Sequence, residues 1–283
     1  MSTSVDTNVS SPASAGAHSS NKPATKRRRE QGPRKTTIWV GRIAFLVGSL
    51  GLWELASKRE WIDPLLFGNP SGIVDSFFEY ISSSEAWTSM QATFTAIALA
   101  FVIGSITGTV AGLALGLSRT LDGIIGPFMA PINSVPRIAL APLFIAWFGL
   151  TMNAKVVLAV SIVFFILAEN ARSAVRSVDH DLMTMGRVVG LSGRAILWKV
   201  VLPSAVPTMF AGLRLTFTYS LLGVIASEMI AATNGLGQDI VLYSSSYRIN
   251  TVFAILAILM IVAALVNTLF SIVESRLLVW QKT

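Results

Sequence analysis

The chain has 283 residues, of which 53% are hydrophobic and only 13% are charged, with a formal net charge of +7 at pH 7 and a mean hydropathy of +0.64. A soluble domain does not keep that much apolar surface away from water, and several windows are apolar over the ~20 residues that a membrane-spanning helix requires. The chain has no cysteine, which excludes disulfides and thiolate metal sites, and its two histidines are too few to favour a metal centre. It contains neither GxxxxGK[ST] nor GxGxxG, so it has no recognisable nucleotide-binding loop. The composition therefore indicates an all-α polytopic membrane protein that draws its energy from a gradient or from another polypeptide.

The N-terminal tail, residues 1–36, is basic. It contains seven Lys and Arg residues against Asp6 and Glu30, and residues 1–21 hold too little apolar content to fold. We divide the chain into this disordered cytoplasmic tail and a transmembrane domain at 37–283. One interpretation of the run KRRR is a nucleic-acid-binding patch. Its place before a first span favours the other interpretation, a basic cluster that sets the orientation of that span in the membrane.

Six apolar segments are predicted to span the membrane, at residues 38–56, 89–117, 123–148, 154–171, 209–232 and 251–273. With the N-terminus in the cytoplasm, the inner segments hold sixteen Lys and Arg residues. The outer segments hold four, which are Lys58, Arg59, Lys155 and Arg248. Because basic residues accumulate on the cytoplasmic side, we expect both termini in the cytoplasm.

The first outer loop contains a stretch with apolar residues at helical spacing, from Ile73 through Phe77 to Ile81. The pattern predicts a short helix along the outer surface of the bilayer. A packed loop is the alternative.

The second span carries small side chains at every fourth position, here called the small-residue stripe: Ala96, Ala100, Gly104, Gly108, Gly112 and Gly116. Such a stripe lets another helix backbone approach closely. It predicts tight packing within a bundle and no substrate chemistry.

The third span contains prolines at positions 127, 131, 136 and 142, each of which removes a helix donor and disfavours helix just before it. A broken helix survives at membrane depth only where protein or a polar cavity receives the freed carbonyls. Arg137 lies within this stretch, so it is expected to face a cavity or a partner charge. Two roles stay open for it: contact with an anionic solute, or a structural role in which it pairs with Glu228 or binds backbone carbonyls.

The segment between the fourth and fifth spans is too polar to continue either. Asp179 or Asp181 can cap a short helix over DLMTMGRVV, Gly190 is placed to end it in a left-handed turn, and Ser192 can cap a second helix, GRAILWKVVL. Pro203 is expected to stop that second helix. The pattern predicts a helix–turn–helix hairpin on the cytoplasmic face, suited to a rigid contact with another protein.

The spacing from Gly190 to the Leu202-Pro203 pair resembles the "EAA---G---------I-LP" loop of bacterial ABC importer permeases. Further matching blocks along residues 50–280 are LWELA at 52–56, PRIALAPLFIAWFGL at 136–150, RSVD at 176–179, VVLPSAVPTMFAGLRL at 200–215, ASEM at 226–229 and GLGQDI at 235–240. Together they are similar to the subfamily that imports nitrate, sulfonates, taurine and some thiamine-precursor pyrimidines.

The resemblance implies an inner-membrane permease that is surrounded by lipid, needs no cofactor and does not bind nucleic acid. Its implied partners are a second permease subunit, expected to be identical, a dimer of cytoplasmic ABC ATPases and an extracytoplasmic solute-binding protein. The hairpin would be the coupling helix that sits in a groove of the ATPase. The residues implied in this coupling are Thr184, Arg187, Gly190, Leu191, Ser192, Arg194, Leu202 and Pro203. The chain departs from the family where Thr184, Met185 and Gly186 replace Glu-Ala-Ala, which removes a charge contact expected with the ATPase.

For the translocation path we predict Arg137, Asn170 and Glu228. Asn170 lies near the inner end of the fourth span. Glu228 lies deeper in the fifth, where lining the path and bonding another helix are both open roles.

Two other function classes are less well supported. A secondary carrier usually has two related halves with interrupted helices at matching positions, and the proline-broken span has no counterpart in the second half. A membrane enzyme needs convergent catalytic groups, and the ionisable residues within the spans form no recognised set. We therefore predict a non-enzymatic permease for a small anionic solute of the nitrate, sulfonate or taurine class, with a thiamine-precursor pyrimidine as the alternative.

Overall fold

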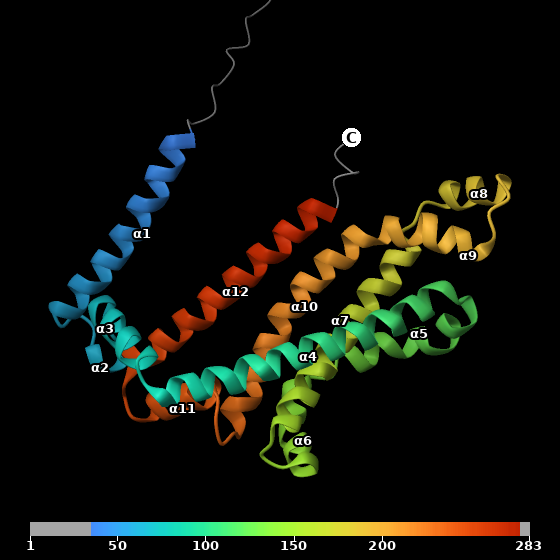
Figure 1. The fold of residues 1–283 in the computed structure, drawn as a ribbon. Helices are drawn as coiled ribbons and strands as arrows, with labels where there is room; N and C mark the ends of the chain where they lie inside the picture. Colours follow the sequence, from blue (N-terminus) through green and yellow to red (C-terminus); the bar gives the residue numbers. More distant parts are fainter. Residues whose placement is uncertain (1–34, 278–283) are drawn as a thin grey trace, which may run out of the picture. The chain divides into compact units, whose positions relative to one another are not determined.

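The computed structural model describes residues 35–277, which form helices, turns and loops and contain no strand. Residues 1–34 of the predicted tail lie outside this described part, as does the C-terminal Lys282. The α-helices, labelled in Figure 1, are α1 (Lys35–Lys58), α2 (Pro64–Phe67), α3 (Pro70–Ile81), α4 (Ser84–Leu117), α5 (Arg119–Asn133), α6 (Ala141–Phe148), α7 (Met152–Arg176), α8 (His180–Val188), α9 (Gly193–Ile196), α10 (Leu202–Ile230), α11 (Leu236–Ser245) and α12 (Ile249–Leu277). Two short helical turns of other types, η1 (Arg137–Leu140) and η2 (Leu197–Val201), precede α6 and α10.

The chain forms two compact units, divided between Gly48 and Ser49. The described part of the first unit is the N-terminal portion of α1. All helices from α2 onward belong to the second unit, which contains every predicted site residue. The predicted boundary after residue 36 stays a prediction.

Five helical stretches are long and apolar enough to cross a membrane: Ile38–Lys58, Ser84–Leu117, Met152–Arg176, Leu197–Ile230 and Ile249–Arg276. The stretches Arg119–Asn133 and Arg137–Phe148 qualify only together and are bent by 83° at their junction, as in a broken span or a re-entrant loop. The prediction of an all-helical protein with about six spans, the third one interrupted, is thus confirmed.

The small-residue stripe brings α4 against α7, as predicted. A side chain at Gly104 would collide with Val163, one at Gly108 would lie 2.5 Å from the carbonyl oxygen of Phe164, and one at Gly112 would collide with the backbone of Ala168. The two helices run side by side in Figure 1. Small side chains allow this approach because each removes the atoms that would hold the helices apart.

The proline-rich stretch breaks at residues 134–136. Pro127 and Pro131 lie inside α5, Pro136 precedes η1 in an extended conformation, and Pro142 lies in the first turn of α6. Two of the four prolines therefore sit within a helix and two flank the break. Pro136 cannot donate to the carbonyl of Ile132, so that oxygen lacks its helical donor four residues on and accepts from the N–H of Val135 at 3.4 Å, with room for a second donor.

The prediction that Pro203 stops the helix after Ser192 is wrong. Helical conformation continues from Gly193 to Ile230 through α9, the π-helical turn η2 and α10. In η2 the N–H of Leu202 bonds the carbonyl of Leu197, five residues back, and Pro203 follows in the first turn of α10, where its missing donor costs little. The fifth candidate span consequently begins at Leu197 rather than at residue 209.

The amphipathic stretch after α1 is a helix, α3, that packs on the rest of the second unit. Tyr80 is buried and its hydroxyl donates to Asp239 of α11 at 2.5 Å, while Phe77 and Ile81 contact the same apolar cluster. Phe78 is 61% exposed on the other side. Burial and the Asp239 carboxylate both raise the pKa of the Tyr80 hydroxyl, so it stays a donor at neutral pH.

Candidate functional site

The segment between α7 and α10 forms the predicted hairpin, and its corner is closed by backbone hydrogen bonds. Asp179 caps α8 by accepting from the N–H of Asp181 at 2.9 Å. At the other end Gly190 has a φ of +82°, its N–H bonds the carbonyl of Arg187 at 3.0 Å, and the N–H of Leu191 bonds Gly186 at 2.9 Å. This pair of bonds around a left-handed glycine is the Schellman arrangement, which fixes the direction in which the chain leaves the helix.

The hairpin is also anchored to the helix that precedes it. Val175 near the end of α7 and Val178 just after it form a buried cluster with Ile196 and Val201. Ser192 caps α9 by accepting from the N–H of Ala195 at 3.3 Å. The corner is therefore rigidly joined to the end of α7, a long helix of the second unit.

The outer surface of this hairpin is apolar and uncovered. Met185 is 64% exposed, Val188 81%, Val189 78% and Trp198 70%. Figure 1 shows α8 and α9 projecting at one end of the second unit, far from α2, α3 and α11. An exposed apolar patch on a rigid projection is typical of a protein contact site.

The residues predicted for coupling all lie on this element or at its exit. Thr184, Arg187, Gly190 and Ser192 are exposed and Leu191 is half-buried. Leu202 and Pro203 begin α10, and the side chain of Arg194 lies outside the described part. Thr184, Met185 and Gly186 occupy the last turns of α8, where Gly186 is buried close to Ile196.

Arg137 lies in η1 at the bend after α5. Its guanidinium donates to the carbonyl of Ser161 on α7 at 2.7 Å and to that of Ile132 at 3.0 Å, and it stacks over the ring of Phe165 at 4.0 Å. The carbonyl of Ile132 is the one that Pro136 leaves without a helical donor. Of the two structural contacts left open for Arg137, the pair with Glu228 is absent and the bonds to backbone carbonyls are present.

Beside this guanidinium lies an open cavity of about 300 Å³, here called the Arg137 cavity. Its walls come from the end of α5, the bend, α7 and α10, and they comprise Asn133, Val135, Arg137, Ile138, Ile162, Ile166 and Tyr219.

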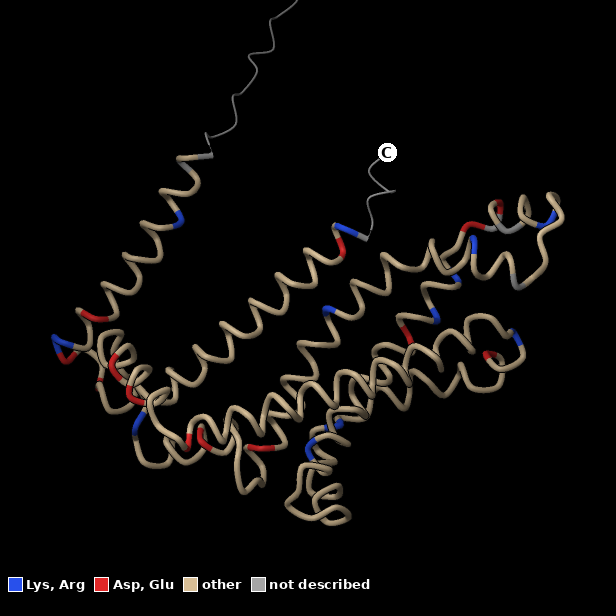
Figure 2. Tube along the Cα trace, in the orientation of Figure 1, with Lys and Arg blue, Asp and Glu red and all other residues tan. Residues whose placement is uncertain are grey.

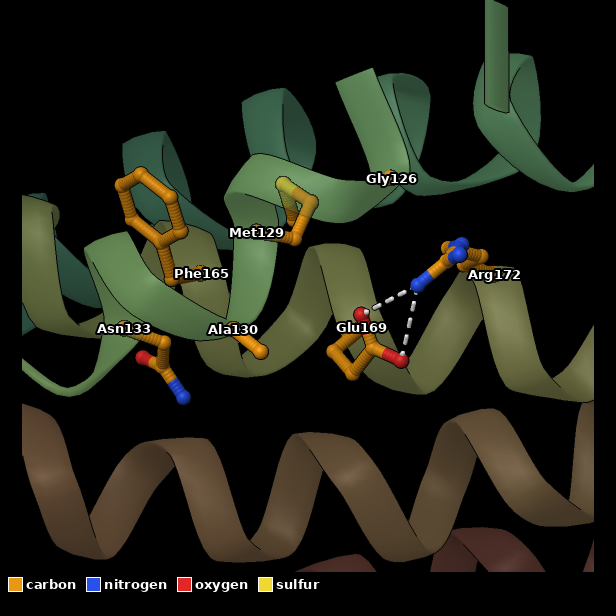
Figure 3. Close-up of a pocket in the computed structure, with 7 residues that line it drawn as sticks. All are labelled: Gly126, Met129, Ala130, Asn133, Phe165, Glu169 and Arg172. Atoms are coloured by element: carbon orange, nitrogen blue, oxygen red, sulfur yellow. Dashed lines mark hydrogen bonds and ion pairs between the residues drawn. The ribbon is translucent and has the colours of Figure 1, made fainter. Parts of the chain in front are cut away.

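A second cavity, of about 220 Å³, lies between α5 and α7 and shares Asn133 with the first. In Figure 3, Glu169 and Arg172 come from one turn of α7, with their ion pair at 3.1 Å, while Gly126 and Met129 come from α5. Arg172 also pairs with Asp122 of α5, so this cation is neutralised on both sides.

Glu228 lies in a closed polar network and is 1% exposed. Its carboxylate pairs with Lys155 of α7 at 3.1 Å, accepts from the hydroxyl of Thr93 at 2.9 Å and accepts from the N–H of Gly237 at 2.9 Å. Thr93 in turn accepts from the N–H of Leu236 at 2.8 Å. The network satisfies the first N–H groups of α11 and joins α4, α7, α10 and α11 at one point.

Asn170 lies apart from Arg137 and Glu228. Its amide donates to the carbonyl of Ile166 at 2.8 Å, and it packs against Gly212 of α10, where an added Cβ would lie 3.0 Å from the side chain. Among the described residues the three predicted path residues make no hydrogen bond or ion pair with one another.

Sequence reasoning missed the role of Lys155, which was counted among the basic residues of the outer side. It is 4% exposed, and its ammonium group also donates to the carbonyl of Asn234 at 2.5 Å. The signal was a single lysine just inside the fourth span together with a single deep glutamate in the fifth, since buried charges occur in pairs. Asp122, which binds both Arg172 and Arg176, was missed in the same way.

Comparison with known proteins places this geometry among transport proteins. The family model for the "Binding-protein-dependent transport system inner membrane component" matches residues 100–279. A protein of Escherichia coli (strain K12) provisionally named an aliphatic sulfonates transport permease is 36% identical over 202 residues, 70% of this chain and 77% of that protein. The taurine transport system permease protein of the same organism is 29% identical over 252 residues, covering 87% of this chain and 90% of its own length.

Solved structures share the fold. An inward-facing methionine ABC transporter matches with a TM-score of 0.59 and 19% identity, over 66% of this chain and 93% of that chain. An amino acid ABC transporter matches with a TM-score of 0.56 and 21% identity, over 67% of this chain and 92% of that chain.

Proposed function

The chain belongs to the family of binding-protein-dependent transport system inner membrane components, and from that membership we propose that it forms the translocation path of an importer for small organic anions of the sulfonate class. Its family is one of transport permeases, not enzymes, and the ATPase and the solute-binding protein are separate partners. The observation that carries the proposed solute is the similarity to a sulfonate and a taurine permease over most of the chain. A formylaminopyrimidine transport permease of Halalkalibacterium halodurans, 26% identical over 238 residues, favours a pyrimidine as the second candidate.

We propose that the hairpin of α8 and α9 is the contact with the ATPase. Three features support this role: the Schellman corner at Gly190, the anchoring of Ile196 to the end of α7, and the exposed apolar surface around Val188. A push on a rigid corner reaches α7 and α10 directly because both helices join it. Within this element the proposed coupling residues are those that the family resemblance implies, from Thr184 to Pro203.

In this proposal the missing Glu-Ala-Ala charge is replaced by apolar contact. Met185 is 64% exposed at the position of the first alanine, and Val188 and Val189 extend the same surface. Burial of such side chains in a groove is favourable without an ion pair.

The end that carries α8 and α9 is proposed to face the cytoplasm. Figure 2 shows Lys and Arg around these helices and the adjoining ends of α7 and α10. This placement agrees with the rule that basic residues accumulate inside. It would put both termini in the cytoplasm and α3 and α11 on the outer side.

The exposed helix faces support a proposed second copy and a lipid surround. Val110 of α4, Leu265 of α12 and Phe128 of α5 are each more than 60% exposed in the single chain. We propose a homodimer in the inner membrane, with the remaining apolar faces against lipid.

Of the three proposed path residues, Arg137 is the one beside an open cavity. Asn170 is half-buried between α7 and α10 and stays a proposed path residue. The contacts of Glu228 support the second of the two roles considered for it, bonding between helices.

Co-purification tests the coupling proposal. The tagged chain, expressed in its host with the partner ATPase, is purified in nanodiscs, and bound proteins are identified by mass spectrometry. We expect a stoichiometric ABC ATPase. A chain that purifies free of any ATPase, although the ATPase is present in the membrane, contradicts the proposal.

A further inference from the structure

The Arg137 cavity has an uneven chemical lining. Within it, Arg137 is the charged side chain, Asn133 and Tyr219 are neutral polar groups, and the remaining lining residues, which include Val135 and Ile162, are aliphatic. No acidic side chain is among its lining residues. The neighbouring α5–α7 cavity differs, because there Arg172 is already paired with Glu169 and Asp122.

Arg137 is fixed in place and still has donors to offer. A guanidinium has five N–H groups, and the structure gives acceptors to two of them, the carbonyls of Ser161 and Ile132. Those bonds and the ring of Phe165 hold the planar group without neutralising its charge. Within residues 35–277 no carboxylate lies within ion-pair distance of it.

The two neutral polar side chains that line the cavity are free to bind a ligand. Neither the Tyr219 hydroxyl nor the Asn133 amide makes a hydrogen bond to another described residue. Tyr219 is 40% exposed on α10 and lines the same cavity. A hydroxyl, an amide and a fixed guanidinium thus border one space from three different elements.

We propose that the Arg137 cavity is a solute-binding site for an anion that carries a short aliphatic chain, with the oxyanion at Arg137 and the chain against Val135, Ile138, Ile162 and Ile166. A planar guanidinium binds the oxygens of a sulfonate through two parallel hydrogen bonds. No carboxylate among the lining residues competes for that attraction. The aliphatic walls select against a bare inorganic anion, which has no apolar part to bury.

This inference rests on the proposed function and deepens it, because it assigns the solute contact to named residues of the permease. The α8–α9 hairpin and the ATPase contact do not depend on it. The two proposals can therefore fail separately.

Substitution of Arg137 itself is a weak test, since it also removes two bonds to backbone carbonyls. Val135 offers a cleaner one. It lies in the bend, is 43% exposed and lines the cavity. Val135→Glu places a negative charge beside the guanidinium, and Val135→Gln is its control of nearly equal size without the charge.

Ligand binding is measured on the purified complex of permease and ATPase, without the solute-binding protein, as the shift in melting temperature with ethanesulfonate. The neutral ethanesulfonamide is the second probe. A ligand that binds only the folded state raises the melting temperature. We expect a shift with ethanesulfonate and none with ethanesulfonamide in the wild type. Val135→Gln loses one aliphatic contact and should bind ethanesulfonate somewhat more weakly than the wild type. Val135→Glu should bind it roughly ten-fold more weakly than Val135→Gln, because like charges oppose binding.

Three results would overturn the site: no shift with ethanesulfonate in the wild type, an equal shift with ethanesulfonamide, or equal affinities in the Glu and Gln variants. Basal ATP hydrolysis and ATPase content are measured on the same samples. If these are normal while the binding results fail, the anion site is wrong and the proposed coupling stands. If no ATPase is bound, the proposed function itself fails.

Discussion

At the scale of single residues, the role of each charged side chain within the spans depends on whether an opposite charge neutralises it. Glu228 and Lys155 neutralise each other at 3.1 Å, and their remaining contacts go to the start of α11 and to Asn234. Arg137 has no such partner among the described residues and keeps its charge beside a cavity. Two intramembrane charges of similar appearance in the sequence thus support different roles, one structural and one facing the solute.

The Glu228–Lys155 pair gives a prediction about stability. Removing one partner leaves the other charge buried alone, which costs about 3–5 kcal/mol. Glu228→Gln and Lys155→Met should therefore each lower the melting temperature of the purified protein markedly, while the double variant should lose much less than the sum of the two.

The exposed pair Arg248–Glu79, at a similar distance of 3.0 Å, is the matched control. Glu79 is 70% exposed at its side chain, and surface pairs contribute about 0–1 kcal/mol. Glu79→Gln should leave the melting temperature nearly unchanged. Additive losses in Glu228→Gln and Lys155→Met would contradict the account of the buried pair.

The sequence identifies these charges but does not pair them. Lys155 and Glu228 are 73 residues apart along the chain, and Thr93 is 135 residues from Glu228. Local patterns carry no information on such distances. The Arg137–Glu228 pair, one of the alternatives left open for Arg137, does not form, because Glu228 pairs with Lys155 and Arg137 binds backbone carbonyls. The sequence indicates that charged side chains within spans need partners, but it does not identify those partners.

At the scale of elements, local sequence rules perform better. The cap at Asp179, the left-handed turn at Gly190 and the cap at Ser192 all form as predicted, since each depends on neighbours within a few residues. The exception is Pro203. Its effect depends on whether the preceding turn can widen, and η2 does so.

The turn at Gly190 gives a second prediction. A β-branched side chain is strained at a φ of +82°, at a cost of about 1–2 kcal/mol, although no neighbour blocks it. Gly190→Val should therefore insert normally but bind less ATPase and lose uptake. Gly193→Val is the control in the same hairpin, because that glycine also has open space and lacks the positive φ.

Normal ATPase content and uptake in Gly190→Val would remove the hairpin corner from the coupling mechanism. An equal loss in Gly193→Val would mean that the side chain itself, and not the turn, disturbs the contact.

The small-residue stripe gives a third prediction. A leucine at Gly108 would push α4 away from the Phe164 backbone, and such overpacking costs about 1–3 kcal/mol. Gly108→Leu should lower the melting temperature and the yield of folded protein. Gly123→Leu on α5 has open space and should change neither. Equal stability of the two variants would contradict the packing of α4 on α7.

At the scale of the whole molecule, composition and hydropathy were enough to predict an all-helical membrane protein with about six spans. They did not predict that the third candidate span is bent by 83° at its middle, because it contains four separate prolines and a kink is possible at each of them. The bend matters for the proposed anion site, because there the Ile132 carbonyl lacks its helical donor four residues on and accepts from Arg137, which helps to position the guanidinium.

The charge distribution belongs to the same scale. Figure 2 shows a group of Lys and Arg at the α8–α9 end of the second unit, which supports the proposed cytoplasmic hairpin. An orientation with α8 outside would leave the proposed coupling surface unable to meet a cytoplasmic ATPase. The proposed coupling role of the hairpin therefore requires the proposed orientation.

The most direct measurement of the central claim is uptake of an isotope-labelled aliphatic sulfonate into liposomes that contain the chain and its partner ATPase, with the solute-binding protein added outside. The account predicts uptake that requires ATP within the liposome and the binding protein outside, and that disappears when either is omitted. Uptake by the chain alone, driven by an ion gradient without ATP, would contradict it.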